Sequence, residues 1–327
     1  MLPIVMPQKF TIAITALLLG IVVSAAVNLQ IGYVDLSFTD FFSGTSGHSQ
    51  VAQLRVNRVL VMLLAGLAIP TSGFLLQEYF QNPLAGPSVL GITSVASLGV
   101  AFYIFVSADF VFPEVVQNSL LSFSAVVGSL LLMVLLLAFS QRFRDKSFLI
   151  IFGFLVSALA GAIISIMQFY AENQSLKNYV LWSFGANNQV SRGQLIILTF
   201  LILAGLFLSF KSIKPLIGNA FGTSYAVSVG VNLQQLKILV IVASSLLSAS
   251  VTAFLGPILF IGIVVPHFSR MLYNPSKLWH QWILNMLLGI LILQTFSIFS
   301  EISQFPLNVI TSLFGIPVIL TMMLREK

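Results

Sequence analysis

The run FLIIFGFLVSALAGAIISIMQFY, residues 148–170, contains no charged side chain and is long enough to cross a lipid bilayer as a helix. Similar runs recur along the 327 residues, of which 58% are apolar and 7% charged, with a mean hydropathy of +1.03. An ordinary soluble domain has about 25% charged residues. A bilayer can cover this much apolar surface, provided that each span satisfies its own backbone hydrogen bonds as a helix. The sequence therefore predicts an all-α polytopic membrane protein.

The apolar runs predict about ten transmembrane helices in a single transmembrane domain that covers residues 1–327. The predicted spans are 10–27, 52–78, 89–106, 117–140, 148–170, 190–210, 236–254, 257–273, 280–300 and 306–324. A signal peptide is an alternative for the first run, because Lys9 precedes it and Ser24-Ala25-Ala26 resembles a cleavage region. Whether residues 1–27 are retained is left open.

Ten helices place both termini on one side, and the basic residues indicate which side that is, because cytosolic loops are enriched in Lys and Arg. The loops on the side of the termini hold 11 of the 15 basic residues: Lys9, Arg142, Arg144, Lys146, Lys211, Lys214, Lys237, Arg270, Lys277, Arg325 and Lys327. The opposite loops hold Arg55, Arg58, Lys177 and Arg192, and also six of the nine acids: Asp35, Asp40, Asp109, Glu114, Glu172 and Glu301. Both termini are therefore predicted to be cytosolic. The net charge of +6 reflects topology rather than nucleic-acid binding.

Several kinds of chemistry are disfavoured by what the sequence lacks. Cysteine is absent, and the three histidines lie far apart in the chain, so no metal site is predicted. The phosphate-binding loop G-x-x-x-x-G-K-[ST] is absent, so ATP hydrolysis would need a separate subunit. No carboxylate lies at the centre of a span, although carriers driven by ion gradients commonly need one. We therefore predict no catalytic residue and no cofactor in this chain.

Two local patterns suggest functional segments. The middle of an inner loop, residues 219–231, is weakly amphipathic, carries small residues and predicts a short helix beneath the membrane. An ordinary interfacial loop helix is the alternative. Prolines and glycines cluster at Pro83 and Pro87 and at Gly256-Pro257, where they predict broken segments. Such breaks are tolerated where they line a cavity, although a simple kink is the alternative.

Five stretches, in order, resemble the FecCD-type permeases, the membrane subunits of bacterial ATP-binding-cassette importers for iron-siderophores, haem and cobalamin. They are Arg55-Val56-Asn57-Arg58; NPLAGPSVLGI, residues 82–92; the loop helix that ends at Gly230-Val231; GPILFIGIVVPHFSR, residues 256–270; and FPLNVITSLFGIPVILTMML, residues 305–324. The resemblance covers residues 55–324.

The resemblance implies ten helices per subunit and a dimer with a second copy or a paralogue. Two ATPase subunits, which bind ATP and Mg²⁺, would lie below the dimer, and a substrate-binding protein would dock above it. The assembly would import a metal chelate across the cytoplasmic membrane of a bacterium by alternating access. A ferric siderophore is the preferred cargo, with haem or cobalamin as alternatives.

The matched motifs also imply roles for particular residues. Residues 219–231 would be the coupling helix that seats on the ATPase, with Asn219, Gly222, Ala226 and Gly230 at the contact. Arg55 and Arg58 would pair with glutamates of the binding protein, with anchoring of a helix end at the headgroups as the alternative. The cytosolic gate would include Asn82, Leu84 and Ser147. Pathway-lining candidates are Met167, Gln168, Thr311 and Ser312, although Met167 could equally serve packing.

Two departures from the family pattern lie near the outer face. Glu301 stands where the family often has an arginine, and Asn308 replaces the glycine of Glu-Leu-Pro-x-Gly. We expect Glu301 to belong to the docking surface but to lack the usual salt bridge, so that the partner differs there or the contact is lost.

Three other functions remain as alternatives. An ion-gradient-driven secondary transporter is disfavoured by the missing intramembrane carboxylates. An integral membrane enzyme is disfavoured by the missing catalytic cluster. An exporter would normally need no docking site for a binding protein.

Overall fold

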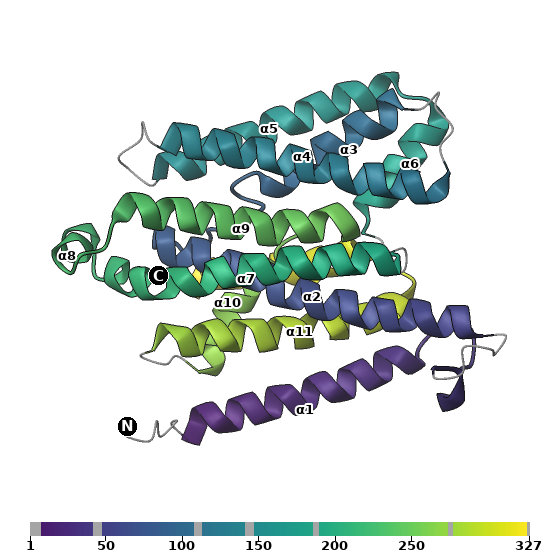
Figure 1. The fold of residues 1–327 in the computed structure, drawn as a ribbon, viewed down its shortest axis with the longest axis horizontal. Coiled ribbons are helices and arrows are strands. Elements are labelled where there is room, and N and C mark those ends of the chain that lie inside the picture. The colour runs from purple at the N-terminus through teal and green to yellow at the C-terminus, as the bar shows by residue number, and fades with distance from the viewer. Residues whose placement is uncertain are drawn as a thin grey trace.

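A computed structural model describes residues 8–41, 48–107, 113–140, 147–185, 190–273 and 277–325 (Figure 1). Within these ranges the chain forms twelve α-helices and one 3-10 turn, and no strand. The elements are α1 (Gln8–Gln30), η1 (Phe38–Phe41), α2 (Ser49–Phe80), α3 (Ile92–Val106), α4 (Glu114–Ser140), α5 (Ser147–Tyr170), α6 (Asn173–Ser183), α7 (Arg192–Ala220), α8 (Thr223–Ser228), α9 (Leu233–Leu255), α10 (Ile261–Leu272), α11 (Leu278–Ser303) and α12 (Leu307–Arg325). The all-α polytopic prediction is confirmed.

Ten of these helices correspond to the ten predicted spans, and two of the ten are short. Eight described helices are long and apolar enough to cross a membrane: α1, α2, α4, α5, α7, α9, α11 and α12. The two shorter apolar helices are α3, with 15 residues, and α10, with 12. At the usual rise per residue they cover only about 18–23 Å of a hydrocarbon core of roughly 30 Å. A crossing at either position would therefore need non-helical backbone as well.

The non-helical segments precede α3 and α10, at the predicted breaks. Helix α2 ends at Phe80 and is followed by Gln81, whose φ of 53° is left-handed, and residues 82–91 then lead to α3. Residues 256–260 lead from α9 to α10, with Gly256 at φ 78° and Phe260 at φ 65°. Both segments are covered by protein, since Ala85, Leu90 and Ile258 are buried. This burial is the condition under which irregular backbone is tolerated between membrane helices.

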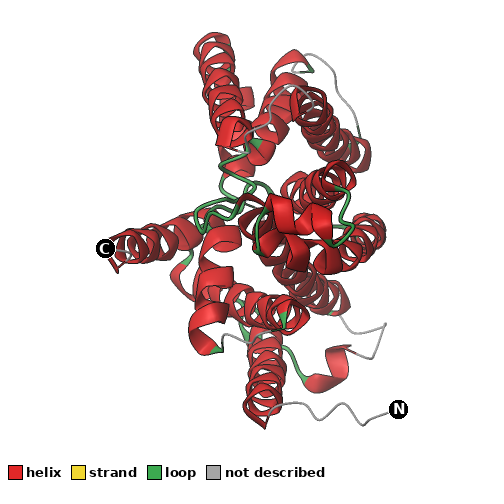
Figure 2. Cartoon of the chain, turned by 90° about the vertical axis from the view of Figure 1, so that its left-hand side faces the viewer, coloured by secondary structure: helices red, strands yellow, loops and turns green. Residues whose placement is uncertain are grey.

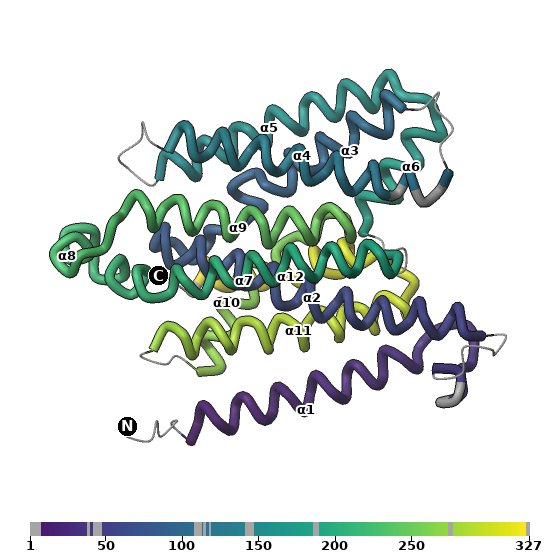
Figure 3. Tube along the Cα trace, viewed as in Figure 1, coloured from purple at the N-terminus to yellow at the C-terminus, as the bar shows by residue number. Residues whose placement is uncertain are grey.

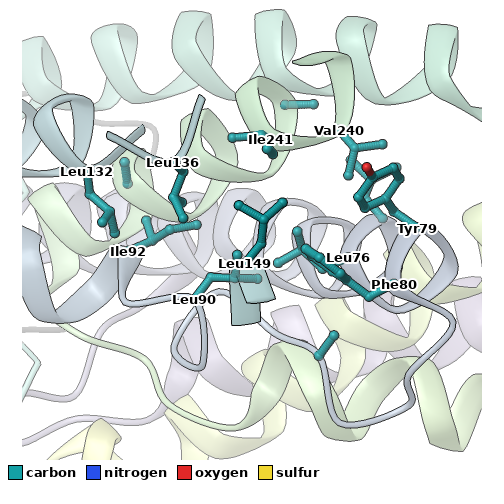
Figure 4. Packing of buried hydrophobic residues seen from close by; sticks show 14 of the residues in the cluster. Leu76, Tyr79, Phe80, Leu90, Ile92, Leu132, Leu136, Leu149, Val240 and Ile241 are labelled. Atoms are coloured by element: carbon teal, nitrogen blue, oxygen red, sulfur yellow. The ribbon is translucent and has the colours of Figure 1, made fainter. Parts of the chain in front are cut away.

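Helices α2 and α9 form the centre of the bundle. Helix α2 packs against α11, α9, α7 and α10, and α9 packs against α7, α2 and α4. Figure 4 shows part of the main apolar cluster, in which Leu76 and Phe80 of α2 pack near Leu90, Leu149 and side chains of α4 and α9. By contrast, α1 lies at the periphery and is mostly exposed.

The start of α1, the end of α12 and the short helix α8 lie at the same end of the bundle (Figures 1 and 3). This arrangement agrees with the prediction that both termini share one side. Following the charge pattern, we name this the inner end and the opposite one the outer end. Seen end-on, α12 stands at the edge of the bundle (Figure 2). Its main contacts are with α11 and α10.

Two elements differ from the predicted spans. Helix α6 falls in no predicted span, because its 11 residues are too polar and too few for a crossing. Helix α7 continues to Ala220, well beyond the predicted end of its span at residue 210, and contains Pro215. The predicted helix 219–231 is accordingly shorter, because only residues 223–228 form α8.

Candidate functional site

A cavity of about 790 Å³ lies between α3, α5, α6 and α12, and we name it the serine-lined cavity. Each of the four helices contributes polar side chains: Ser94 and Ser97 from α3, Ser157 from α5, Ser183 from α6, and Asn308 and Ser312 from α12. Every described residue that lines it is uncharged. Pro257 and Leu259, from the non-helical segment before α10, complete the wall. The break at Gly256-Pro257 therefore lines a cavity, as one of the two sequence interpretations predicted.

The serine hydroxyls of this cavity are held by their own helices. Ser97, Ser157 and Ser183 each donate the hydroxyl proton to a backbone carbonyl three or four residues earlier, at 2.8–2.9 Å. Because each hydroxyl has a single proton, the oxygen lone pairs are what it can offer to the cavity. These three hydroxyl groups are thus oriented before any ligand binds.

Helix α6 is tied to the start of α12. The backbone N–H of Asn308 donates to the carbonyl of Phe184 at 3.1 Å, and its side-chain amide donates to the carbonyl of Ser183 at 3.1 Å. Tyr179 of α6 also lines the cavity and is largely buried, and this burial raises the pKa of Tyr179 to about 12. Burial thus disfavours the charged phenolate and keeps the hydroxyl neutral even at alkaline pH.

The four residues predicted to line the pathway occupy different environments. Ser312 lines the serine-lined cavity. Thr311 is fully buried, and its hydroxyl donates to the carbonyl of Asn308 at 3.0 Å. Met167 lines a separate, mostly apolar cavity of about 680 Å³ between α3, α4 and α5. Gln168 is half-buried on α5 and is not among the residues that line either cavity.

The predicted gate residues lie on two elements. Asn82 and Leu84 are half-buried in the segment after α2, where the Asn82 side chain accepts a hydrogen bond from the N–H of Leu84 at 2.9 Å. Ser147 is exposed at the first residue of α5. Their role as a gate stays a prediction.

The residues predicted to contact the ATPase lie in different environments around α8. Ala226 is fully buried and faces Gly218 of α7. Gly222 and Gly230 flank the helix at φ 99° and 82°, conformations that glycine adopts without strain, and their contact with an ATPase stays a prediction. The exposed side chains around α8 are large and apolar: Phe221, Tyr225, Val227 and Val229.

Asn219 belongs to α7 and is buried, not part of α8. Its amide donates to the carbonyls of Glu78 and Tyr79, both at 3.3 Å. These are carbonyls of the last turn of α2, which lack partners within their helix. Asn219 therefore fastens the end of α7, and with it the start of α8, to the end of α2.

Arg270 of α10 contacts the same end of α2. Its guanidinium donates to the Gln77 side chain and lies 3.4 Å from the Glu78 carboxylate. The Gln77 amide in turn donates to the carbonyl of Ile263 in α10, at 3.2 Å. We name Gln77, Glu78, Asn219 and Arg270 the inner polar cluster. The cluster joins α2, α7 and α10 close to α8.

At the outer end, the two arginines predicted to dock a binding protein are buried within the subunit. Arg55 donates to the carbonyls of Leu29 and Gln30, at 3.1 and 2.9 Å, and to that of Val34. These groups include the carboxyl end of α1, where cations are favoured by the helix dipole. Arg55 thus anchors the carboxyl end of α1 through hydrogen bonds within the protein. The sequence alternative had placed this anchoring at the lipid headgroups.

Arg58 is also buried and forms an ion pair with Glu301 of α11, with Nη1 and Oε1 2.7 Å apart. It donates further to the carbonyls of Asn28 and Ile31. Glu301 thus has a salt-bridge partner within the chain, while its expected lack of the usual salt bridge to a binding protein stays a prediction. The docking role of these three residues stays a prediction, and the structure gives Arg55 and Arg58 internal partners instead.

The fold and these sites define a class of protein: a polytopic α-helical membrane protein with broken helices beside an uncharged cavity. The sequence matches the profile of the FecCD transport family over residues 17–325. The chain belongs to this family, as its sequence motifs indicated.

Individual relatives agree with this assignment. The chain is 29% identical over 321 residues to the hemin transport system permease protein HmuU of Yersinia pestis, covering 95% of each protein. It is 30% identical over 293 residues to the vitamin B12 import system permease protein BtuC of Photorhabdus laumondii, covering 88% of this chain and 85% of the relative. A solved structure described as an inward-facing conformation of an ABC transporter of metal-chelate type superposes with a TM-score of 0.81 at 25% identity. That match covers 96% of this chain and 99% of the other.

Sequence reasoning missed most of the serine-lined cavity. Ser94 and Ser97 are three residues apart, which places them on one face of α3, and this spacing is a signal that could have been used. Ser157 gives no such signal, because a lone serine in an apolar span more often bonds its own helix. Asn308 was noted only as a departure from the family pattern.

Proposed function

We propose that this chain is the membrane-spanning permease subunit of an ATP-driven importer for a metal chelate. The observation that carries the proposal is the serine-lined cavity, an uncharged space between helices whose mostly apolar wall carries hydroxyl and amide groups from four helices. An uncharged lining suits a large cargo that has to be released after crossing. The names of the hemin and vitamin B12 permeases support this class of cargo. Within it we prefer a ferric siderophore, with haem and cobalamin as alternatives.

Energy for transport would come from two separate ATPase subunits that bind ATP and Mg²⁺. The absent phosphate-binding loop supports this division of labour. Helix α8 would be the coupling helix, seated on the ATPase through the exposed Phe221, Tyr225, Val227 and Val229. The inner polar cluster would carry the motion of α8 to α2 and α10, because Asn219 links α7 to α2 and Arg270 links α10 to α2.

A second permease, identical or a paralogue, would complete the pathway. Helices α5 and α12 support this part of the proposal, because both carry long exposed apolar faces; on α12 these include Leu313, Ile316 and Leu320. The serine-lined cavity lies between the same two helices. The assembly would lie in the cytoplasmic membrane of a bacterium, and a substrate-binding protein would dock at the outer end.

In the proposed cycle, the loaded binding protein docks and the permease dimer alternates between outward-open and inward-open forms. ATP binding and hydrolysis bias these forms because each nucleotide state has a different affinity for each form. An ion-gradient-driven secondary transporter is the second candidate. The described lining residues disfavour it, since none is a carboxylate.

The experiment is uptake into proteoliposomes that hold the permease with its ATPase. The cognate binding protein is loaded in turn with labelled ferric siderophore, haem and cobalamin, with and without ATP. Uptake of one cargo that requires both ATP and the binding protein supports the proposal. Uptake by the permease alone, driven by an ion gradient, overturns it.

A further inference from the structure

We infer that Lys211 and Lys214 of α7, together with Lys277 at the start of α11, bind the headgroup of an anionic phospholipid in the inner leaflet. We name these three residues the inner lysine patch, and all three are exposed. This lipid contact lies outside the proposed function, because it needs neither cargo nor ATP.

The length of α7 places two of the lysines at the level of the headgroups. The helix begins at Arg192 at the outer end, and Lys211 follows nineteen residues later. At the usual rise per residue, these residues cover about 29 Å, which matches a hydrocarbon core of roughly 30 Å. Lys211 and Lys214 therefore lie where the hydrocarbon of the inner leaflet ends, and the last turns of α7 extend beyond it.

A contact between α7 and α11 brings the third lysine to the same depth. The indole N–H of Trp282 donates to the hydroxyl of Ser209 at 2.8 Å, and its ring lies 5.9 Å from that of Phe210. The two helices run in opposite directions (Figure 1). Lys214 follows Ser209 by five residues, and Lys277 precedes Trp282 by five. Both lysines thus lie about 7–8 Å further inward than this contact, beside a tryptophan, a residue enriched at membrane interfaces.

The charge of the inner lysine patch is not neutralised by an acid of the described chain. Glu78 is the acidic residue that the described ranges place at the inner end, and it lies 3.4 Å from Arg270. The ammonium group of Lys211 lies 4.5 Å from the centre of the Phe207 ring, a contact that leaves its N–H groups able to donate to phosphate oxygens. The patch is therefore complementary to an anionic phosphate group.

Exposed apolar side chains identify a lipid as the occupant. Leu203, Phe207 and Phe210 are exposed on the membrane side of the lysines. Their spacing of three and four residues places them on the same face of α7 as Lys211 and Lys214. A phospholipid can lay its acyl chains along this apolar surface while its phosphate contacts the lysines. A free phosphate ion would use only the charged part of the surface.

The test is native mass spectrometry of the permease–ATPase complex, titrated in detergent with phosphatidylglycerol or with phosphatidylcholine of the same acyl chains. One lysine near an anionic headgroup contributes about fivefold in affinity before screening by salt. We therefore expect phosphatidylglycerol to bind at least about tenfold more tightly than phosphatidylcholine. The double variant Lys211→Gln, Lys214→Gln should lose most of this preference. Equal binding of the two lipids, or an unchanged preference in the variant, overturns the inference.

A second double variant, Lys9→Gln with Lys177→Gln, is the matched control. It removes the same charge from two exposed lysines outside the patch, one on α1 and one on α6. An equal loss of preference in this control would show diffuse attraction to the whole surface and would overturn the inference.

Two further readouts separate a lipid from other anionic partners. Inorganic phosphate should not displace phosphatidylglycerol more than chloride does at the same ionic strength, and displacement by phosphate alone would contradict a lipid site. The ATPase should stay bound in the Lys211→Gln, Lys214→Gln variant. Loss of the ATPase with an unchanged lipid preference would assign these lysines to the protein partner instead.

Discussion

Arg58 and Glu301 form an ion pair of 2.7 Å inside one subunit, between helices α2 and α11, with 3% and 14% of their side chains exposed. Arg58 also donates to two carbonyls near the end of α1, so this guanidinium joins three helices. A second polar link lies next to it, where Gln294 of α11 accepts from Asn28 at 2.7 Å and donates to the carbonyl of Val59 at 2.8 Å. The outer end of the peripheral helix α1 is therefore held by polar contacts rather than by an apolar core.

We expect Glu301→Ala to destabilise the permease, because it leaves the Arg58 guanidinium buried without its counter-charge. Loss of one partner of a buried pair costs about 3–5 kcal/mol, whereas an apolar replacement of both partners is often close to neutral. Arg58→Met combined with Glu301→Leu should therefore restore much of the loss. The measurement is thermal unfolding in detergent. Glu172→Ala, at an exposed acid of the same end, is the control, and strictly additive effects of the two substitutions would contradict the coupling.

The contrast between Arg58 and the long spans shows what the sequence could and could not predict. Spans such as residues 148–170 are predictable because a bilayer demands a continuous apolar helix, whichever neighbours the helix has. The partner of Arg58 could not be predicted, because Glu301 is distant in the chain and only the packing of α2 against α11 brings the two residues together. The distribution of charges along the sequence placed both residues correctly at the outer end, but it did not predict that they form an ion pair.

The candidate site was predictable to a similar degree. Pro and Gly marked the breaks before α3 and α10, because these residues interrupt helices wherever they occur. The serine-lined cavity was not predictable, since it depends on which faces of α3, α5, α6 and α12 meet. Ala226 illustrates the same limit: its small size suggested contact with a partner, but the structure buries it against α7.

Gly73→Ala is expected to prevent correct packing of α2 against α10. A Cβ at this position would lie 1.6 Å from the carbonyl oxygen of Gly262, which is backbone and cannot move aside without displacing α10. Gly161→Ala is the control, because nothing lies within 4 Å of a Cβ there and alanine favours helix by about 1 kcal/mol. The yield of monodisperse protein and the melting temperature should fall for Gly73→Ala alone. Equal behaviour of the two variants would show that α2 and α10 approach less closely than the structure indicates.

Asn219→Ala is expected to weaken coupling between ATP hydrolysis and transport. It removes two hydrogen bonds from Asn219 to the end of α2 and leaves the exposed face of α8 intact. Binding of the ATPase should therefore persist, while transport per ATP hydrolysed falls several-fold, in keeping with roughly 1 kcal/mol for each lost bond. The measurement is uptake and ATPase activity in the same proteoliposomes, with Asn173→Ala, at an exposed asparagine of α6, as the control. If uptake and hydrolysis fell together, the inner polar cluster would have a structural role only.

Stability should depend on pH through Tyr179, whose pKa is raised by burial to about 12. The neutral phenol is favoured in the folded state, and an unfolded tyrosine has a pKa of about 10. The folded state therefore binds this proton more tightly, so the contribution is fully present below pH 10 and is lost as the pH rises from about 10 to 12. Tyr179→Phe should remove this part of the alkaline loss, measured as the change in melting temperature between pH 9 and 11. Tyr170→Phe is the control, because Tyr170 is 80% exposed on α5. An identical alkaline loss in the Tyr179→Phe variant and the unsubstituted protein would mean that Tyr179 titrates normally and that the α6 wall of the cavity is open to water.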